Sequence, residues 1–218
     1  MRYNDAITNQ PSEAINKTLR STYSLLAMTL FFSAFTAFLS ISLQLPHPGL
    51  IITLVGFYGL LFLTHKFQNS GLGIIFVFAL TGFMGLTIGP IISMYLNLPN
   101  GGSMVMTAFG ITGLSFLGLS AYAIATKKDF SFLNGFLVVG VFVLIGAMIA
   151  NIFLQMPALQ IFLSAGFALF SAAMILWQTG EIVRGGETNY IIATVNLYVS
   201  IYNMFLSVLS LLGMANDD

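Results

Sequence analysis

The last long apolar run of the chain carries polar side chains that could do chemistry. The stretch NLYVSIYNMF, residues 196–205, places two amides, two phenols and one hydroxyl within eight positions. These groups exchange hydrogen bonds, so they could join neighbouring helices or line a polar path through a membrane. None of them is charged at neutral pH. The residues concerned are Asn196, Tyr198, Ser200, Tyr202 and Asn203.

The groups that membrane enzymes need are missing from the apolar segments. Both histidines, His47 and His65, lie in connections near segment ends, so a serine protease with a Ser–His pair is not supported. The chain has no H-E-x-x-H motif and no cysteine. The aspartates lie in the polar N-terminal stretch, in a loop and at the C-terminus. We therefore expect no enzyme activity, no metal and no cofactor.

The composition is typical of an integral membrane protein. Of the 218 residues, 57% are hydrophobic and 6% are charged, and the formal net charge of zero suggests no nucleic-acid partner. Strands are not expected, because the apolar runs do not alternate with polar residues. The sequence predicts an all-α protein with seven transmembrane helices, near residues 22–44, 49–64, 72–96, 104–126, 130–154, 158–180 and 190–213.

The basic residues predict the orientation of these helices. Three connections, at 44–49, 97–103 and 154–157, contain no Lys or Arg. All seven basic residues fall on the other side if every segment crosses the membrane, and the positive-inside rule makes that side cytoplasmic. Residues 1–21 are then a flexible cytoplasmic tail, with a helix that begins near 11–13. Residues 22–214 form the transmembrane domain, and the C-terminus lies outside.

Helical projection places the polar residues of the last segment on two faces. Asn196, Ser200 and Asn203 share one side, whereas Tyr198 and Tyr202 lie on the opposite side. A helix with two polar faces has no good face for lipid, so we expect it at the centre of the bundle. The polar residues are then either interhelical hydrogen-bonding groups or the lining of a polar cavity.

Small residues predict close contacts between helices. Gly82, Gly85 and Gly89 in the third segment would let another backbone approach closely. Gly89 and Pro90 form a candidate kink, because proline removes a backbone hydrogen bond. The same packing role is expected in the fourth segment for Gly110, Gly113 and Gly118.

The stretch from 177 to 213, WQTGEIVRGGETNYIIATVNLYVSIYNMFLSVLSLLG, resembles the C-terminal signature of the Bax inhibitor-1 family. The matching elements are Gly185-Gly186-Glu187, Asn189-Tyr190-Ile191, Ala193-Thr194, Leu197-Tyr198 and Asn203-x-Phe205. Further stretches upstream, such as TGFMGLTIGPII and ANIFLQMPALQ, extend the resemblance from about residue 19 to 213.

The resemblance implies a fold and two alternative activities. The fold has two three-helix layers around the C-terminal helix. Bacterial inner-membrane members modulate FtsH, a membrane-anchored ATP- and zinc-dependent protease, as inhibitors or poor substrates. Other members are proposed to leak calcium or other cations, with a pair of aspartates that gates the leak by pH.

The sequence departs from that aspartate pair. The two positions hold Gln178 and Ser200, neither of which titrates. Two neighbouring acids share a proton and can respond to pH near neutrality, whereas an amide and a hydroxyl cannot. A leak through this chain is therefore expected to lack the family's pH gate.

Overall fold

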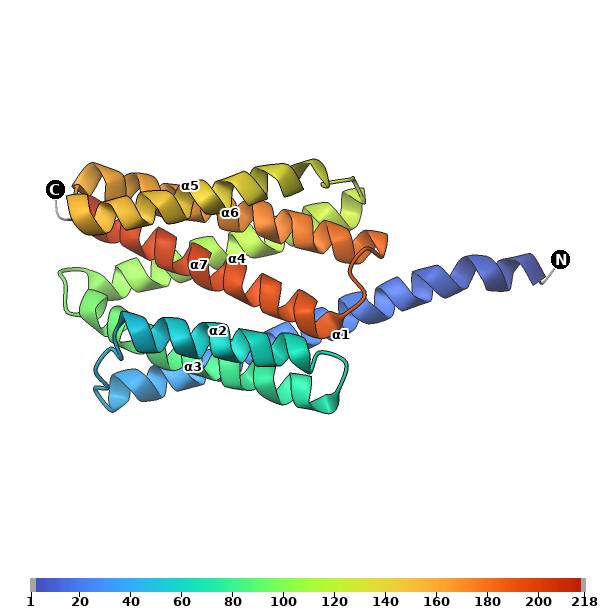
Figure 1. Ribbon diagram of the computed structural model, residues 1–218, viewed down its shortest axis with the longest axis horizontal. Helices are drawn as coiled ribbons and strands as arrows, with labels where there is room; N and C mark the ends of the chain where they lie inside the picture. Colours follow the sequence, from blue (N-terminus) through green and yellow to red (C-terminus); the bar gives the residue numbers. More distant parts are fainter. Residues whose placement is uncertain (1–2, 217–218) are drawn as a thin grey trace. The chain divides into compact units, whose positions relative to one another are not determined.

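The computed structural model describes residues 3–216, with side chains from residue 12 onward, so Arg2, Asp217 and Asp218 lie outside the described residues. The described chain is all-helical, with seven helices and no strand (Figure 1). The helices are α1 (Tyr3–Ser42), α2 (Leu50–Lys66), α3 (Gly71–Leu96), α4 (Gly101–Thr126), α5 (Phe132–Leu154), α6 (Pro157–Arg184) and α7 (Tyr190–Asn216).

Each predicted apolar segment corresponds to one helix. The main difference is that α1 begins at Tyr3, before the predicted start near 11–13, and runs without a break into the first apolar segment. Within the described residues, six helices are long and apolar enough to cross a membrane. The remaining one, α2, has 17 residues, which is at the lower limit for a spanning helix.

The helix ends follow from local backbone chemistry. Asn100, Lys127 and Gln155 adopt the left-handed conformation next to the helices α4 and α5. Pro157 is the first residue of α6, where its missing N–H costs no helical hydrogen bond. Gly49 precedes α2 with a φ of 87°, a backbone conformation in which a residue with a side chain would be strained.

The chain divides into two compact units. One holds α1, α2 and α3 with residues 185–198, and the other holds α4, α5 and α6 with residues 199–216. The helix α7 therefore contributes its first part to the first unit and its second part to the other. The grouping of three helices with three agrees with the expected architecture, whereas the central position of α7 stays a prediction.

In the first unit, α3 packs on α1 through its glycines, as predicted. A Cβ added at Gly85 would lie 2.3 Å from the backbone oxygen of Ser33, and one at Gly89 would lie 2.5 Å from the Cβ of Ser40. At Gly82 the neighbour is the ring of Phe32, at 2.6 Å. Close backbone approach of this kind maximises van der Waals contact, the main attraction between helices in lipid.

Pro90 lies inside α3, and α1 supplies the hydrogen bond that it removes. Pro90 has no N–H to give to the carbonyl of Leu86, its partner four residues earlier in a helix. The hydroxyl of Ser40 donates to that carbonyl at 2.9 Å. The kink itself stays a prediction, but the unsatisfied carbonyl next to it is compensated from the neighbouring helix.

This compensation predicts a coupling between Ser40 and Pro90. We expect Ser40→Ala to cost about 1 kcal/mol of unfolding free energy, since a polar group in a membrane interior loses its partner. In a Pro90→Ala background the cost should fall by roughly half or more, because the introduced alanine has a backbone N–H that can donate to Leu86. A double-mutant cycle by SDS titration in mixed micelles, followed by circular dichroism, measures the coupling. Equal costs in both backgrounds would contradict it.

The prediction for the glycines of α4 is wrong. An added Cβ at Gly110, Gly113 or Gly118 meets nothing within 4 Å among the described residues. The side of α4 that packs in its unit instead carries Ala108 and Ala123, which are fully buried. The physical reason is that glycine permits a close approach without specifying which side of a helix receives one.

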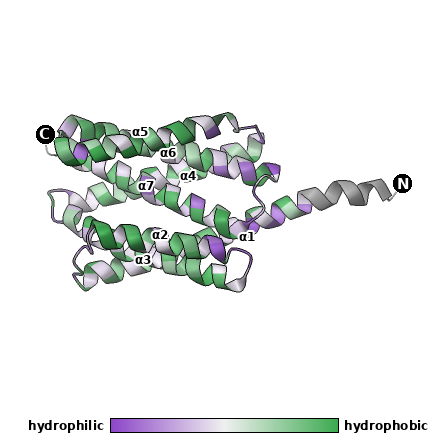
Figure 2. Ribbon diagram, viewed as in Figure 1, coloured by the Kyte–Doolittle hydropathy of each residue, from purple (hydrophilic) through white to green (hydrophobic). Residues whose placement is uncertain are grey.

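In the second unit, α5 packs on α6 and exposes most of its surface. Gly140 lies against Phe170, and Gly166 lies against Leu144. Only Leu137 and Leu144 of α5 are buried, whereas apolar side chains such as Phe142 are largely exposed. Figure 2 shows hydrophobic residues along the helices, with the hydrophilic ones mostly near helix ends and loops. Such exposed apolar surface is expected of helices that face lipid.

Candidate functional site

Tyr198, predicted as part of a polar core, joins three helices of the first unit. Its side chain is only 1% exposed. The hydroxyl lies 2.5 Å from the Oγ of Ser33 on α1 and donates to the backbone oxygen of Thr81 on α3 at 3.3 Å. The close approach at Gly85 brings the Ser33 region of α1 against α3. This part of the polar pattern therefore forms hydrogen bonds between helices.

A second side chain on the same side of α7 as Tyr198, that of Thr194, also contacts α1. The hydroxyl of Thr194 lies 3.2 Å from the carbonyl of Thr22 on α1 and 2.7 Å from that of Tyr190 in its own helix. Both threonines are fully buried. Thr194 and Tyr198 are four residues apart, so they lie on one side of the helix. The sequence pattern predicted this side of α7 but did not identify its partners, Thr22, Ser33 and Thr81.

In the second unit, the rest of α7 contacts α6 and α4. Ser210 accepts a hydrogen bond of 2.9 Å from Ser164 of α6. Phe205 packs edge-on against Phe109 of α4, with ring centroids 5.9 Å apart. The hydroxyl of Ser207 donates to the carbonyl of Asn203 at 2.7 Å. Ser210 thus bonds to a neighbouring helix, whereas the predicted polar residue Asn203 accepts a bond within α7 itself.

The two positions that we predict to match the family's aspartate pair are buried. Gln178 is 1% exposed and Ser200 is 4% exposed. The other predicted core residues, Asn196, Tyr202 and Asn203, are half-buried. Neither an amide nor a hydroxyl exchanges a proton near neutral pH, so these two positions provide no pH-sensitive pair. The lining of a pore by these residues stays a prediction.

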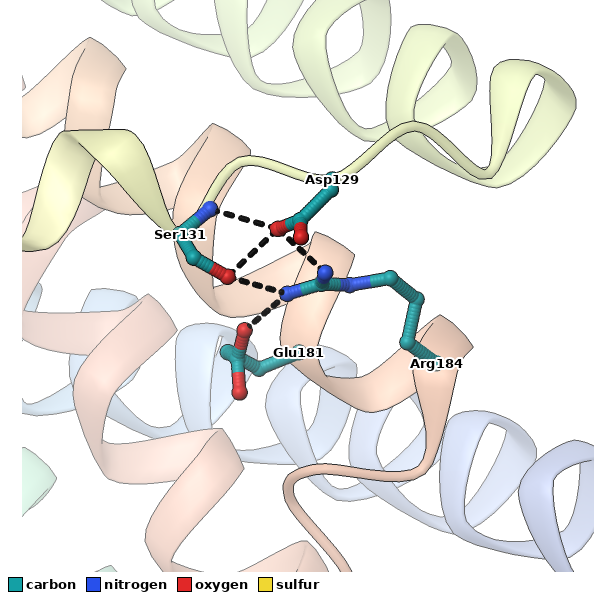
Figure 3. A network of polar contacts seen from close by, with 4 residues as sticks. All are labelled: Asp129, Ser131, Glu181 and Arg184. Carbon is teal, nitrogen blue, oxygen red and sulfur yellow. Dashed lines mark hydrogen bonds and ion pairs between the residues drawn. The ribbon is translucent and has the colours of Figure 1, made fainter.

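An ionic network ties the loop after α4 to the end of α6 (Figure 3). Arg184 forms ion pairs with Asp129 in the loop and with Glu181 one turn earlier in α6. Its Nη2 also donates to the hydroxyl of Ser131 at 3.1 Å. Glu181 and Arg184 are three residues apart, so helix geometry makes them neighbours, whereas Asp129 lies 55 residues before Arg184.

The network lowers the pKa of Asp129 below its ordinary value of 3.8. The main causes are the side-chain and backbone hydrogen bonds from Ser131, and the positive charge of Arg184 adds to them. The folded protein therefore binds fewer protons at this carboxyl than the unfolded chain does. Its contribution to stability is present above the ordinary pKa and is lost as the pH falls through the lower, folded pKa.

Replacing Asp129 should change how stability depends on pH. We expect Asp129→Asn to lower the melting temperature at pH 6 and to have a smaller effect at about pH 3, where the wild-type carboxyl begins to be protonated. The effect should be modest, since the side chain is 66% exposed. Thermal melts in detergent by circular dichroism test this, and an equal difference at both pH values would contradict it.

The same loop is also held by an aromatic contact. Phe130 is buried and lies against Gly180 of α6, where an added Cβ would be 2.7 Å from its ring. Lys128 lies over the ring of Tyr122, 5.7 Å from the centroid. Asp129 binds Arg184, which also binds Glu181, so the loop is fixed to the end of α6. The ammonium of Lys128 lies near the aromatic ring of Tyr122.

Asn189 forms a hydrogen-bonded junction at the start of α7. Its carboxamide oxygen accepts from the backbone N–H groups of Ile191 and Ile192, at 3.0 and 3.2 Å. Its Nδ2 donates to the carbonyl of Gln68 at 3.2 Å and to the Oδ1 of Asn69 at 3.0 Å. One side chain therefore caps α7 and ties it to the α2–α3 loop.

A pocket of about 420 Å³ lies at this junction. The residues around it are Gln68, Asn69, Ser70, Gly71, Thr188, Asn189, Tyr190 and Ile191, so most contribute amides or hydroxyls and none is charged. Within the part of the chain that the structure describes, no three His, Asp or Glu side chains are grouped to hold a metal ion.

Comparisons with known proteins find one matching family model and relatives of more than 50% identity. The family model described as "Inhibitor of apoptosis-promoting Bax1" matches residues 15–217. "Modulator of FtsH protease YccA" of Escherichia coli K12 is 55% identical over 93% of this chain and 92% of that protein. The same values hold for "Inner membrane protein YccA" of E. coli O6:H1. An uncharacterized protein of Pseudomonas aeruginosa is 54% identical over 99% of this chain and 96% of its own length.

Proposed function

Because the chain belongs to the Bax inhibitor-1 family, we propose that it is a non-enzymatic modulator of an FtsH-type membrane protease, acting as an inhibitor or poor substrate. The observation that carries the proposal is the 55% identity, over nearly full length, with a protein named as a modulator of FtsH. Identity of this extent covers all seven helices and their loops rather than one motif.

We further propose that all seven helices cross a bacterial inner membrane, with the N-terminus in the cytoplasm and the C-terminus in the periplasm. The contact of Asn189 with the α2–α3 loop supports this, because it places the start of α7 at the same end as Lys66. In the second unit, the pairing of Asp129 with Arg184 brings the loop containing Lys128 to the end of α6. In the first unit Lys66 thus lies at the end where α7 begins, and in the second unit Lys128 and Arg184 share one end.

The polar part of α1 is a candidate handle for the protease. Residues 12–20 include exposed Glu13, Lys17 and Arg20 and precede the apolar part of the helix. In the proposed orientation this segment lies in the cytoplasm. An ATP-driven protease needs an accessible polar segment to engage a membrane substrate, and exposed segments near a chain end are the usual sites of proteolytic attack.

The proposal is tested with purified chain and FtsH in liposomes. We expect the two proteins to copurify, and the chain to slow FtsH turnover of a reference membrane substrate while it is itself degraded slowly. With ADP in place of ATP, degradation should stop while copurification persists, which separates binding from proteolysis. No copurification and unchanged turnover of the reference substrate would refute the function.

A further inference from the structure

The pocket at the start of α7 is an open depression with a mostly polar lining. Its volume of about 420 Å³ falls within the range of small ligand sites. Two hydrogen bonds of Asn189, to Gln68 and Asn69, join the start of α7 to the α2–α3 loop, and two more cap α7. In addition, the backbone N–H of Asn189 donates to Glu187 at 2.7 Å, which fixes the loop that enters the pocket.

The chemistry of the pocket selects an uncharged hydrogen-bonding partner. None of its lining residues is charged, so a charged partner finds no opposite charge in the lining itself. Amides and hydroxyls such as those of Gln68 and Thr188 offer both donors and acceptors. This combination matches the peptide groups and neutral polar side chains of another polypeptide segment.

The position of the pocket indicates which polypeptide it would contact. Thr188, on its rim, accepts through its carbonyl a hydrogen bond of 3.5 Å from Thr18 of α1. An added Cβ at Gly185, in the same loop, would lie 3.5 Å from Ile15. The pocket is therefore continuous with the polar segment 12–20, and a protein that engages that segment also meets the pocket.

We propose that this pocket is a docking site for an uncharged, polar segment of the FtsH-type protease, next to the segment that the protease engages. This inference rests on the proposed function and adds the surface through which the two proteins bind. The occupant is a protein segment held by neutral hydrogen bonds, so the part of the affinity that comes from the pocket should depend little on salt concentration.

The test compares two double variants of the full chain. Gln68→Ala with Thr188→Ala removes hydrogen-bonding side chains from the pocket but leaves Asn189 in place. Asn97→Ala with Ser103→Ala is the control, with two exposed polar residues outside the pocket. We expect the pocket variant to bind FtsH about tenfold more weakly and the control to bind as wild type does. Both variants should melt at the wild-type temperature.

A photo-crosslinking residue at position 68 or 97 gives a readout that does not depend on stability. Crosslinks to FtsH from position 68 and not from position 97 support the docking site. If FtsH binds the pocket variant at wild-type affinity and forms no crosslink at position 68, the docking site is refuted while the proposed function stands. If FtsH does not bind the wild-type chain, the proposed function fails, and the docking site fails with it.

Discussion

Gly85→Ala is expected to destabilise the first unit by about 3 kcal/mol. An added Cβ would lie 2.0 Å from the Oγ1 of Thr36 and 2.3 Å from the backbone oxygen of Ser33. A hydroxyl can rotate away, but a backbone oxygen moves only if α1 and α3 separate. Separation would also weaken the bond between Ser33 and Tyr198, which depends on the same close approach.

The matched control for this prediction is Gly110→Ala in α4. Its added Cβ meets no described atom within 4 Å, so we expect no loss of stability and a gain of up to about 1 kcal/mol from helix propensity. SDS titration followed by far-ultraviolet circular dichroism compares the two variants with the wild type. Equal effects of the two substitutions would show that α3 and α1 do not approach closely at Gly85.

The two glycine substitutions also illustrate what sequence analysis could predict. Apolar runs identify the helices, because a membrane span needs a run of fixed minimum length. Small residues identify helices that can approach closely. However, Gly85 and Gly110 are the same residue type, and both lie within apolar stretches of the sequence. What distinguishes them is a partner helix with small or hydrogen-bonding residues at matching heights, as Ser33 and Ser40 on α1 are for α3.

The polar contacts were predictable only where both partners are close in sequence. Glu181 and Arg184 are one turn apart, and helix geometry makes them neighbours. Asp129 reaches the same arginine only because the turn after α4 and the packing of Phe130 on Gly180 bring it there. Long-range pairs of this kind depend on the tertiary fold, which local sequence patterns do not specify.

The predicted absence of the family's aspartate pair has a consequence for the proposed function. Gln178 and Ser200 occupy buried positions, where two acids would have to share a proton or be paired. With neutral residues there, the protein needs no proton at these positions to keep its fold near neutral pH. The absence of a titrating pair at these positions agrees with the proposed function, which depends on binding a protease rather than on sensing acid.

Tyr198 provides the sharpest test of whether the polar residues of α7 join helices or line a path. We expect Tyr198→Phe to cost about 1 kcal/mol, because it removes the hydroxyl shared by Ser33 and Thr81 but keeps the ring. Tyr198→Ala should cost about 3–5 kcal/mol, since it also leaves a cavity at a position that is 1% exposed. Chemical unfolding in micelles measures both variants.

The contribution of the Tyr198 hydroxyl to the free energy of unfolding can be isolated with Ser33→Ala. If Ser33 and Tyr198 act through one hydrogen bond, the double variant with Tyr198→Phe should cost less than the sum of the two single variants. The same proteins in liposomes loaded with a calcium dye test the other interpretation. If the hydroxyl of Tyr198 serves only to form hydrogen bonds between helices, Tyr198→Phe should leave calcium flux at the wild-type level. A changed flux with unchanged stability would instead place this hydroxyl on a conducting path.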